Sequence, residues 1–179
     1  ILRAQVERCK HILGSISAAA GELRAESGSA QALDTYVQDL LYRWTASRNG
    51  IQLQQHLEGC KPAPRVVIDQ TLEQALINIL NNAADASPMD VKVDAKWTQH
   101  ELDIDVADRG EGISTEMASL AGNTILSTKQ DGLGLGLFLS YTTLQRLGGD
   151  VQLLNREHGG VICRIRLLID KLRVSDNEQ

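Results

Sequence analysis

The chain has 179 residues, a hydrophobic content of 42% and a formal net charge of -5 at pH 7. This length suits one domain of ordinary size with a smaller appendage, and the apolar content is enough to build a buried core. The negative charge and the lack of a Lys/Arg cluster argue against a nucleic-acid partner. With one Phe, two Trp and three Tyr, platforms for base stacking are scarce as well.

Three widely spaced cysteines, Cys9, Cys60 and Cys163, make neither a disulfide framework nor a zinc site, which is typical of a reducing compartment. No apolar run in the sequence is long enough to cross a bilayer, and no signal peptide is visible. Because the chain begins at Ile1 rather than Met, we expect it to be a piece of a longer protein.

The first 48 residues are expected to be helical, with a Gly/Ser/Glu-rich break at 21–30. Within residues 1–20, apolar side chains follow alternating steps of four and three, and these are Leu2, Val6, Cys9, Leu13 and Ile16. This pattern spans only two heptads. It is equally consistent with a helix that packs on its own domain and with a helix that pairs with its copy in a dimer. A second helix is predicted over about 32–47, and the Asn49-Gly50 turn places a domain boundary between about 45 and 50.

Beyond residue 50 the pattern mixes short strands with helices. Strands are predicted near 51–57, 66–68, 91–97, 102–107, 151–154 and 161–169. Helices are predicted over 70–86 and 135–147, with a short one near 114–120 and an irregular, lid-like segment at 121–131. This order favours an α+β fold, a two-layer sandwich with one mixed sheet under helices. We therefore expect a helical segment at 1–48, a main domain at 49–170 and a disordered charged tail at 171–179.

Two asparagines on the helix predicted at 70–86 could hold a metal ion. Asn78 and Asn82 are one turn apart and therefore project from the same face. An amide is costly on the buried side of a helix unless it is satisfied, and its oxygen is a hard ligand suited to Mg²⁺. A pair of asparagines that cap or hydrogen-bond near the helix end explains the spacing at least as well.

The strand predicted at 102–107 runs into Asp-Arg-Gly-Glu-Gly-Ile at residues 108–113. The carboxylate of Asp108 could accept a hydrogen bond from the exocyclic amino group of adenine, which hypoxanthine lacks. Gly110 and Gly112 would let the backbone approach a flat base. Taken alone, these residues would more often make an ordinary Asp-rich turn.

A glycine run, Gly132, Gly134 and Gly136, adjoins the helix predicted at 135–147. Exposed N–H groups at a helix N-terminus favour phosphate, and Lys129 could meet a terminal phosphate. No strand leads into the run, so it does not match a dinucleotide-binding fingerprint, and close packing is the alternative explanation. Together, however, the three sets supply a metal, a base and a phosphate site in one order, which favours a nucleotide pocket.

These residues resemble the ATP-binding domain of sensor histidine kinases, part of a superfamily with gyrase, MutL and the heat-shock chaperone ATPases. Residues 78–85, 108–113 and 132–136 resemble its N, G1 and G2 boxes, and the resemblance covers about 50–169. It implies a Bergerat-type fold that binds ATP with Mg²⁺, in which Asn82 ligates the metal with help from Asn78. The implied nucleotide-binding residues are Asn78, Asn82, Asp85, Asp108, Gly110, Gly112, Ile113, Thr128, Lys129, Gly132, Leu133, Gly134, Leu135 and Gly136.

Hydrolytic members of this superfamily carry a Glu four residues before the metal asparagine, where this chain has Asn78. An amide cannot take a proton from water, so phosphoryl transfer is favoured over hydrolysis, with Asn78 and Lys129 as the catalytic residues. In such a kinase the γ-phosphoryl group passes to a histidine and then to the receiver domain of a response regulator. The alternatives are a GHKL-type ATPase and a non-catalytic nucleotide-binding or dimerisation module.

Residues 3–13 are similar to the end of the dimerisation helices in redox-responsive kinases of the RegB/PrrB type. That resemblance implies a homodimer through the N-terminal helices and a cytoplasmic domain of an inner-membrane sensor. It also implies that Cys9 responds to oxidation, although a small buried residue in a helix seam explains Cys9 equally well.

The chain departs from the family pattern in three places. The phosphoacceptor histidine, which an acidic residue should follow, is expected outside this chain, because only His100 precedes an acid and it lies in a predicted strand turn. The Phe-rich F box reads Asn-Thr-Ile-Leu-Ser-Thr-Lys at 123–129, which puts the docking of the lid in doubt. Val161 stands where a Thr often lies near the adenine, which would weaken one contact to the base.

Overall fold

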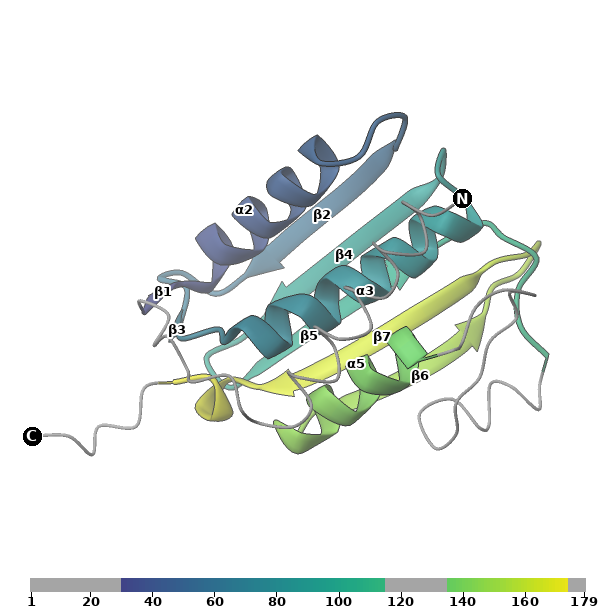
Figure 1. Ribbon diagram of the computed structural model, residues 1–179. Helices are drawn as coiled ribbons and strands as arrows, with labels where there is room; N and C mark the ends of the chain where they lie inside the picture. Colours follow the sequence, from purple (N-terminus) through teal and green to yellow (C-terminus); the bar gives the residue numbers. More distant parts are fainter. Residues whose placement is uncertain (1–29, 115–134, 174–179) are drawn as a thin grey trace, which may run out of the picture.

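The computed structural model describes residues 30–114 and 135–173, which form a five-stranded sheet with helices on one face (Figure 1). The strands in order across the sheet are β2 (Leu53–Gly59), β4 (Val91–Trp97), β5 (Glu101–Ala107), β7 (Val161–Leu168) and β6 (Asp150–Asn155). β2 runs parallel to β4, and the remaining neighbours are antiparallel. The predicted mixed sheet under a helical layer is therefore confirmed.

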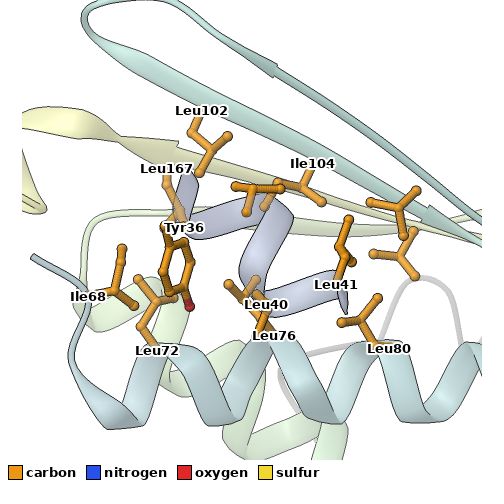
Figure 2. A pocket seen from close by; sticks show the side chains of 13 residues that line it. Tyr36, Leu40, Leu41, Ile68, Leu72, Leu76, Leu80, Leu102, Ile104 and Leu167 are labelled. Carbon is orange, nitrogen blue, oxygen red and sulfur yellow. The ribbon is translucent and has the colours of Figure 1, made fainter. Parts of the chain in front are cut away.

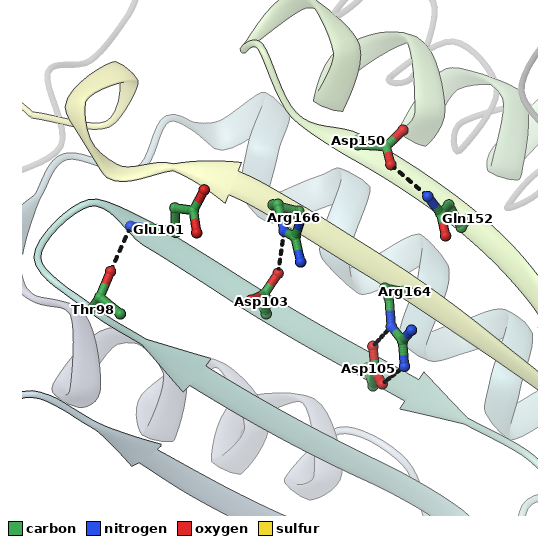
Figure 3. A network of polar contacts seen from close by, with 8 residues as sticks. All are labelled: Thr98, Glu101, Asp103, Asp105, Asp150, Gln152, Arg164 and Arg166. Carbon is green, nitrogen blue, oxygen red and sulfur yellow. Dashed lines mark hydrogen bonds and ion pairs between the residues drawn. The ribbon is translucent and has the colours of Figure 1, made fainter.

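Buried and more exposed side chains alternate along the strands, so one face of the sheet is covered and the other is open. In β4, Val91 and Val93 are buried, whereas Lys92 and Asp94 between them are only partly buried. On the open face, cross-strand ion pairs join β5 to β7, including Arg166 Nε to Asp103 Oδ1 at 2.7 Å (Figure 3). Exposed pairs of this kind contribute about 0–1 kcal/mol each. Most of the stability therefore comes from the face that the helices cover.

The helix α3 (Gln70–Ala86) has the bounds that the sequence predicts. The carboxylate of Asp69 caps it by accepting from the N–H of Leu72 at 2.7 Å, which satisfies one of the free donors of the first turn. Pro88 follows its last turn and cannot continue the helix. α3 packs beside α5 (Leu135–Arg146), which the sequence predicts over 135–147.

The helix α2 (Leu33–Ala46) shares its hydrophobic core with the sheet and with α3. Its buried side chains belong to one cluster with those of α3, β4, β5 and β7. The indole N–H of Trp44 also donates to Asn81 Oδ1 of α3 at 2.9 Å. The division of the chain at residue 48 stays a prediction, but on packing grounds α2 belongs with the domain that follows it.

Two boundaries differ from the sequence prediction because pairing partners set them. β2 starts at Leu53 and runs to Gly59, since its parallel register matches the whole of β4, from Val91 to Trp97. The strand predicted at 66–68 is only β3 (Arg65–Val66), which pairs with the short β1 (Gln31–Ala32). α2 begins at Leu33, directly after β1, so the described pairing ends there with the bond from the N–H of Leu33 to the carbonyl of Pro64.

The predicted disordered tail is wrong at its first residues. A 3-10 helix, η1 (Ile169–Lys171), follows β7, and Leu172 is buried. The carbonyl of Leu172 accepts from the N–H of Val67 at 2.7 Å, which fixes the chain beside β3. The segments predicted at 1–20, 114–120 and 121–131, with Cys9 among them, lie outside the described residues except for Ser114.

A small apolar cavity of about 20 Å³ lies between α2, α3 and the sheet, with Tyr36 at its edge (Figure 2). Tyr36 is 3% exposed, and within the described part of the chain its hydroxyl has no hydrogen-bond partner. Burial raises the pKa of Tyr36, with the nearby Glu73 adding to the effect. The hydroxyl therefore costs free energy of desolvation without a bond in return.

We expect Tyr36→Phe to leave the free energy of unfolding unchanged or to raise it by about 1 kcal/mol, because it removes an unpaired buried hydroxyl. Urea unfolding of the variant measures this directly. Tyr42→Phe on the same helix is the control, since Tyr42 is 76% exposed and should have no effect. A loss of stability in Tyr36→Phe would contradict the account and show that the hydroxyl is bonded.

Candidate nucleotide-binding site

Asp108 lies where β5 leaves the sheet, and it is only 7% exposed. Its N–H continues the ladder to β7 by donating to the carbonyl of Val161 at 3.0 Å. Its Oδ1 accepts from the N–H groups of Gly110 at 2.8 Å and Val161 at 3.2 Å. Among the described residues, nothing donates to its Oδ2. A firmly held carboxylate thus keeps one oxygen to accept from a ligand.

The Asp108 loop, residues 108–113, packs between the end of α3 and the hairpin turn, residues 155–161. A Cβ on Gly110 would lie 2.9 Å from the Cβ of Ala86, the last residue of α3. Gly112 has a φ of +84°, which side chains rarely adopt. Across the hairpin turn, a Cβ on Gly160 would lie 2.1 Å from the carbonyl oxygen of Asp108. Glycine is therefore required by close packing or backbone conformation at each of the three positions.

Two residues of the hairpin turn hold this loop, and neither was predicted from the sequence. The side-chain amide of Asn155 donates to the carbonyl of Ile113 at 2.6 Å and accepts from its N–H at 2.9 Å. The guanidinium of Arg156 donates to the carbonyl of Asp108. The partners are 42 and 48 residues apart along the chain, so no local pattern could have indicated them.

The asparagines of α3 have different surroundings. Asn78 is 6% exposed, and its Oδ1 accepts from Gln74 Nε2 at 3.1 Å, whereas Asn82 is exposed. Asn81, which is not among the predicted site residues, accepts a hydrogen bond from Trp44 and so connects α3 to α2. Asp85 is exposed and pairs with Arg48 at 3.2 Å. Only Asn82 and Asp85 therefore present side chains to solvent from the predicted set on this helix.

The predicted phosphate site is described only at its end. Leu135 begins α5, and the carbonyl of Gly136 accepts from the hydroxyl of the buried Ser140 at 2.8 Å. A Cβ on Gly136 would meet no described atom within 4 Å, so packing among these residues does not require glycine there. The other predicted residues, Thr128, Lys129, Gly132, Leu133 and Gly134, lie outside the described residues.

The donor chemistry on α3 suits a hard cation. Among residues 30–114 and 135–173, no group of three or more His, Cys, Asp or Glu side chains could hold a metal ion. A cation here would depend on amide oxygen, water and phosphate, a set that Mg²⁺ accepts and that zinc does not favour. Asn82 fits this role better than Asn78, whose oxygen already accepts from Gln74.

Cys163 lies on β7, opposite Val106 of β5, and is 7% exposed. Burial, with the carboxylates of Asp105 and Asp108 nearby, raises the pKa of this thiol from 9.0 to about 12. The protonated thiol of the folded state therefore contributes fully to stability below about pH 9, and the contribution is lost as the pH rises toward 12.

At about pH 8, Cys163 should resist alkylation in the folded protein, because the thiolate is the reactive form and the site is closed. Cys60, which is partly exposed, should react and serves as the internal control. Mass spectrometry after a timed treatment with iodoacetamide distinguishes the two. Equal labelling of both cysteines would contradict the burial of Cys163.

The fold and the sequence of this chain have counterparts among known proteins. A family model described as "Histidine kinase-, DNA gyrase B-, and HSP90-like ATPase" matches residues 68–171. This match covers more than half of the chain, and the chain belongs to this family of nucleotide-using domains. None of the helices in the described residues is long and apolar enough to span a membrane.

Two curated relatives show how far the similarity extends. The chain is 24% identical to the sensor histidine kinase RegB of Cereibacter sphaeroides over 201 residues, which cover 99% of this chain and 43% of RegB. It is 36% identical to the C4-dicarboxylate transport sensor protein DctB of Pseudomonas aeruginosa over 104 residues, 54% of this chain and 17% of DctB. The chain thus spans less than half the length of these relatives.

Among solved structures, the catalytic domain of the histidine kinase ThkA superposes with a TM-score of 0.65 at 21% identity. The superposition covers 80% of this chain and 97% of that domain. At this identity the likeness establishes the fold, and it confirms the predicted Bergerat-type sandwich.

Proposed function

We propose that this chain is the ATP-binding catalytic portion of a two-component sensor histidine kinase. It delivers the γ-phosphoryl group of ATP to a histidine outside residues 1–179, and a response-regulator aspartate then receives it. Membership of the matched family supports the proposal, and so do the relatives named as a sensor histidine kinase, RegB, and as a transport sensor protein, DctB. The buried Asp108, with one oxygen left to accept, supports recognition of a base that carries an amino group.

The residues of the proposed site divide the work of binding. Asp108 Oδ2 accepts from the exocyclic amino group of adenine, while Gly110 and Gly112 let the backbone lie against the ring. Asn82, with help from Asn78, would hold Mg²⁺, which would supply neutralisation of the phosphate charge when bound. The N–H groups around Gly136, with Lys129 and Thr128, bind the phosphates.

The single observation that supports phosphoryl transfer over hydrolysis of ATP is the neutral amide at Asn78. Asn78 is 6% exposed, and its oxygen accepts a hydrogen bond from Gln74. A general base must take the proton from an attacking water, and an amide cannot. The pocket therefore favours a nucleophile that brings its own basic nitrogen, as a histidine does.

The proposal is tested by supplying the missing half of the reaction. The chain is incubated with Mg·ATP and a helix-pair fragment of a related kinase that carries the acceptor histidine. We expect a phosphorylated fragment, and none when that histidine is replaced by Gln. Binding of ATP without any transfer would instead favour a non-catalytic nucleotide module, and steady turnover of ATP without the fragment would favour an ATPase.

The wider setting belongs to the same proposal. We infer that the intact protein dimerises through its N-terminal helices, that its partner is a receiver domain, and that this domain faces the cytoplasm beside an inner-membrane sensor. Cys9 would then lie in the seam between the two copies, where a disulfide to its symmetry mate could inhibit the kinase.

If Cys9 is such a switch, mild oxidation of the chain should produce a covalent dimer on non-reducing gels. The Cys9→Ser variant should stay monomeric under the same treatment, whereas Cys60→Ser should behave as the unaltered chain. Cys163 should not contribute, because it is buried. Dimers that persist in Cys9→Ser and vanish in Cys60→Ser would contradict the role of Cys9.

A further inference from the structure

The Asp108 loop does not hold its own shape. Within residues 108–113, one hydrogen bond connects the loop to itself, from the N–H of Gly110 to Asp108 Oδ1. The bonds at its two ends, at Asp108 and at Ile113, are made to the hairpin turn. The conformation of such a loop depends on the segment that it contacts, which here is the hairpin turn.

Asn155 makes the contact at the far end of the loop. Its amide bonds both the N–H and the carbonyl of Ile113, at 2.9 and 2.6 Å, as a neighbouring strand would. A Cβ on Gly112 would lie 3.0 Å from Asn155 Oδ1, so the two residues are in close contact. A side chain here takes the place of a strand that the loop lacks.

The near end of the loop is fixed by the same hairpin turn. Arg156 donates to the carbonyl of Asp108, and Gly160 packs directly against that carbonyl. The N–H of Val161 then bonds Asp108 Oδ1, which sets the plane of the carboxylate. The hairpin turn therefore controls both the place of the loop and the direction in which Oδ2 points.

We propose that Asn155 is a positioning residue for base recognition, acting through the Asp108 loop without touching the nucleotide. This inference rests on the proposed function of Asp108. Without Asn155 the loop samples other conformations, and a nucleotide must order it again at a cost in affinity. The preference for adenine over hypoxanthine also falls, because this preference depends on the direction of Asp108 Oδ2. The phosphates are the same in both nucleotides and contribute little to it.

The test compares Asn155→Ala with Gln152→Ala, which truncates an exposed amide on the same strand that hydrogen-bonds Asp150. Calorimetry measures the affinity of each variant for adenosine diphosphate and for inosine diphosphate. We expect Asn155→Ala to bind the adenine nucleotide about tenfold more weakly, since two hydrogen bonds that order the loop are lost. The inosine nucleotide should lose much less, so that the ratio of the two affinities falls. Gln152→Ala should match the unaltered chain in both.

Asn155→Ser keeps one oxygen that can serve Ile113, and its ratio should lie between the other two. An unchanged ratio in Asn155→Ala would overturn the inference, whether neither affinity changes or both fall by the same factor, as a general loosening of the fold would cause. If the unaltered chain binds adenosine diphosphate no better than inosine diphosphate, the role of Asp108 fails first. That result would overturn the proposed function together with the inference.

Discussion

Asp108→Asn should reduce the affinity for adenosine diphosphate at least about a hundredfold while the protein stays folded. The new amide can place its oxygen where Asp108 Oδ1 now accepts from Gly110 and Val161, so the loop keeps its bonds. Its nitrogen then replaces Oδ2 and faces the amino group of adenine as a second donor. Loss of a charge-assisted bond and creation of a donor–donor contact together cost about 3 kcal/mol.

Calorimetry without Mg²⁺ measures this loss, because it isolates the base from the metal. Asp105→Asn is the matched control, since Asp105 lies on the same β5 strand but pairs with Arg164 on the open face (Figure 3). The control should bind as the unaltered chain does. Binding of Asp108→Asn within threefold of the unaltered chain would contradict the role of Asp108 as reader of the base.

Asn82→Ala should abolish the increase in ATP affinity that Mg²⁺ provides, while its free energy of unfolding stays near that of the unaltered chain. Asn82 is exposed on α3, so its truncation removes a ligand and little packing. Titration of ATP with and without Mg²⁺ gives the difference directly.

The neighbouring Asn81 supplies a control with the opposite outcome. Asn81→Ala leaves the indole N–H of the buried Trp44 without its partner, which should cost about 1–3 kcal/mol of stability. Its Mg²⁺-dependent gain in affinity should persist. If Asn81→Ala lost that gain and Asn82→Ala kept it, the metal ligand would be assigned to the wrong asparagine.

The parts of the fold that depend on local pattern were predictable. The helix at 70–86 combines an apolar face with an Asp cap and a following Pro, and each signal indicates the same bounds. The strands at 91–97 and 102–107 alternate apolar and polar residues, because one face of the sheet is open to solvent. Asp108 at the strand end, with Gly110 and Gly112 after it, followed from the same kind of signal.

Other features depend on contacts between distant segments, for which spacing carries no information. The step of four residues places Asn78 and Asn82 on one face, but it does not tell that Gln74 bonds the first or that Asn81 bonds Trp44. Likewise, nothing in the local sequence distinguishes Asn155 from any other residue at the end of a strand. Residues 171–173 are ordered because the N–H of Val67 bonds the carbonyl of Leu172, and these two residues are more than a hundred positions apart in the sequence.

The central claim, that the pocket gives its phosphoryl group to histidine rather than to water, is tested most directly by following γ-labelled ATP. The chain, Mg²⁺ and a helix-pair fragment with its acceptor histidine are mixed, and the label is divided between phosphohistidine and inorganic phosphate. We predict that the label accumulates on the fragment while release of inorganic phosphate stays at the rate seen without the chain. Steady release of inorganic phosphate with an unlabelled fragment would contradict the account.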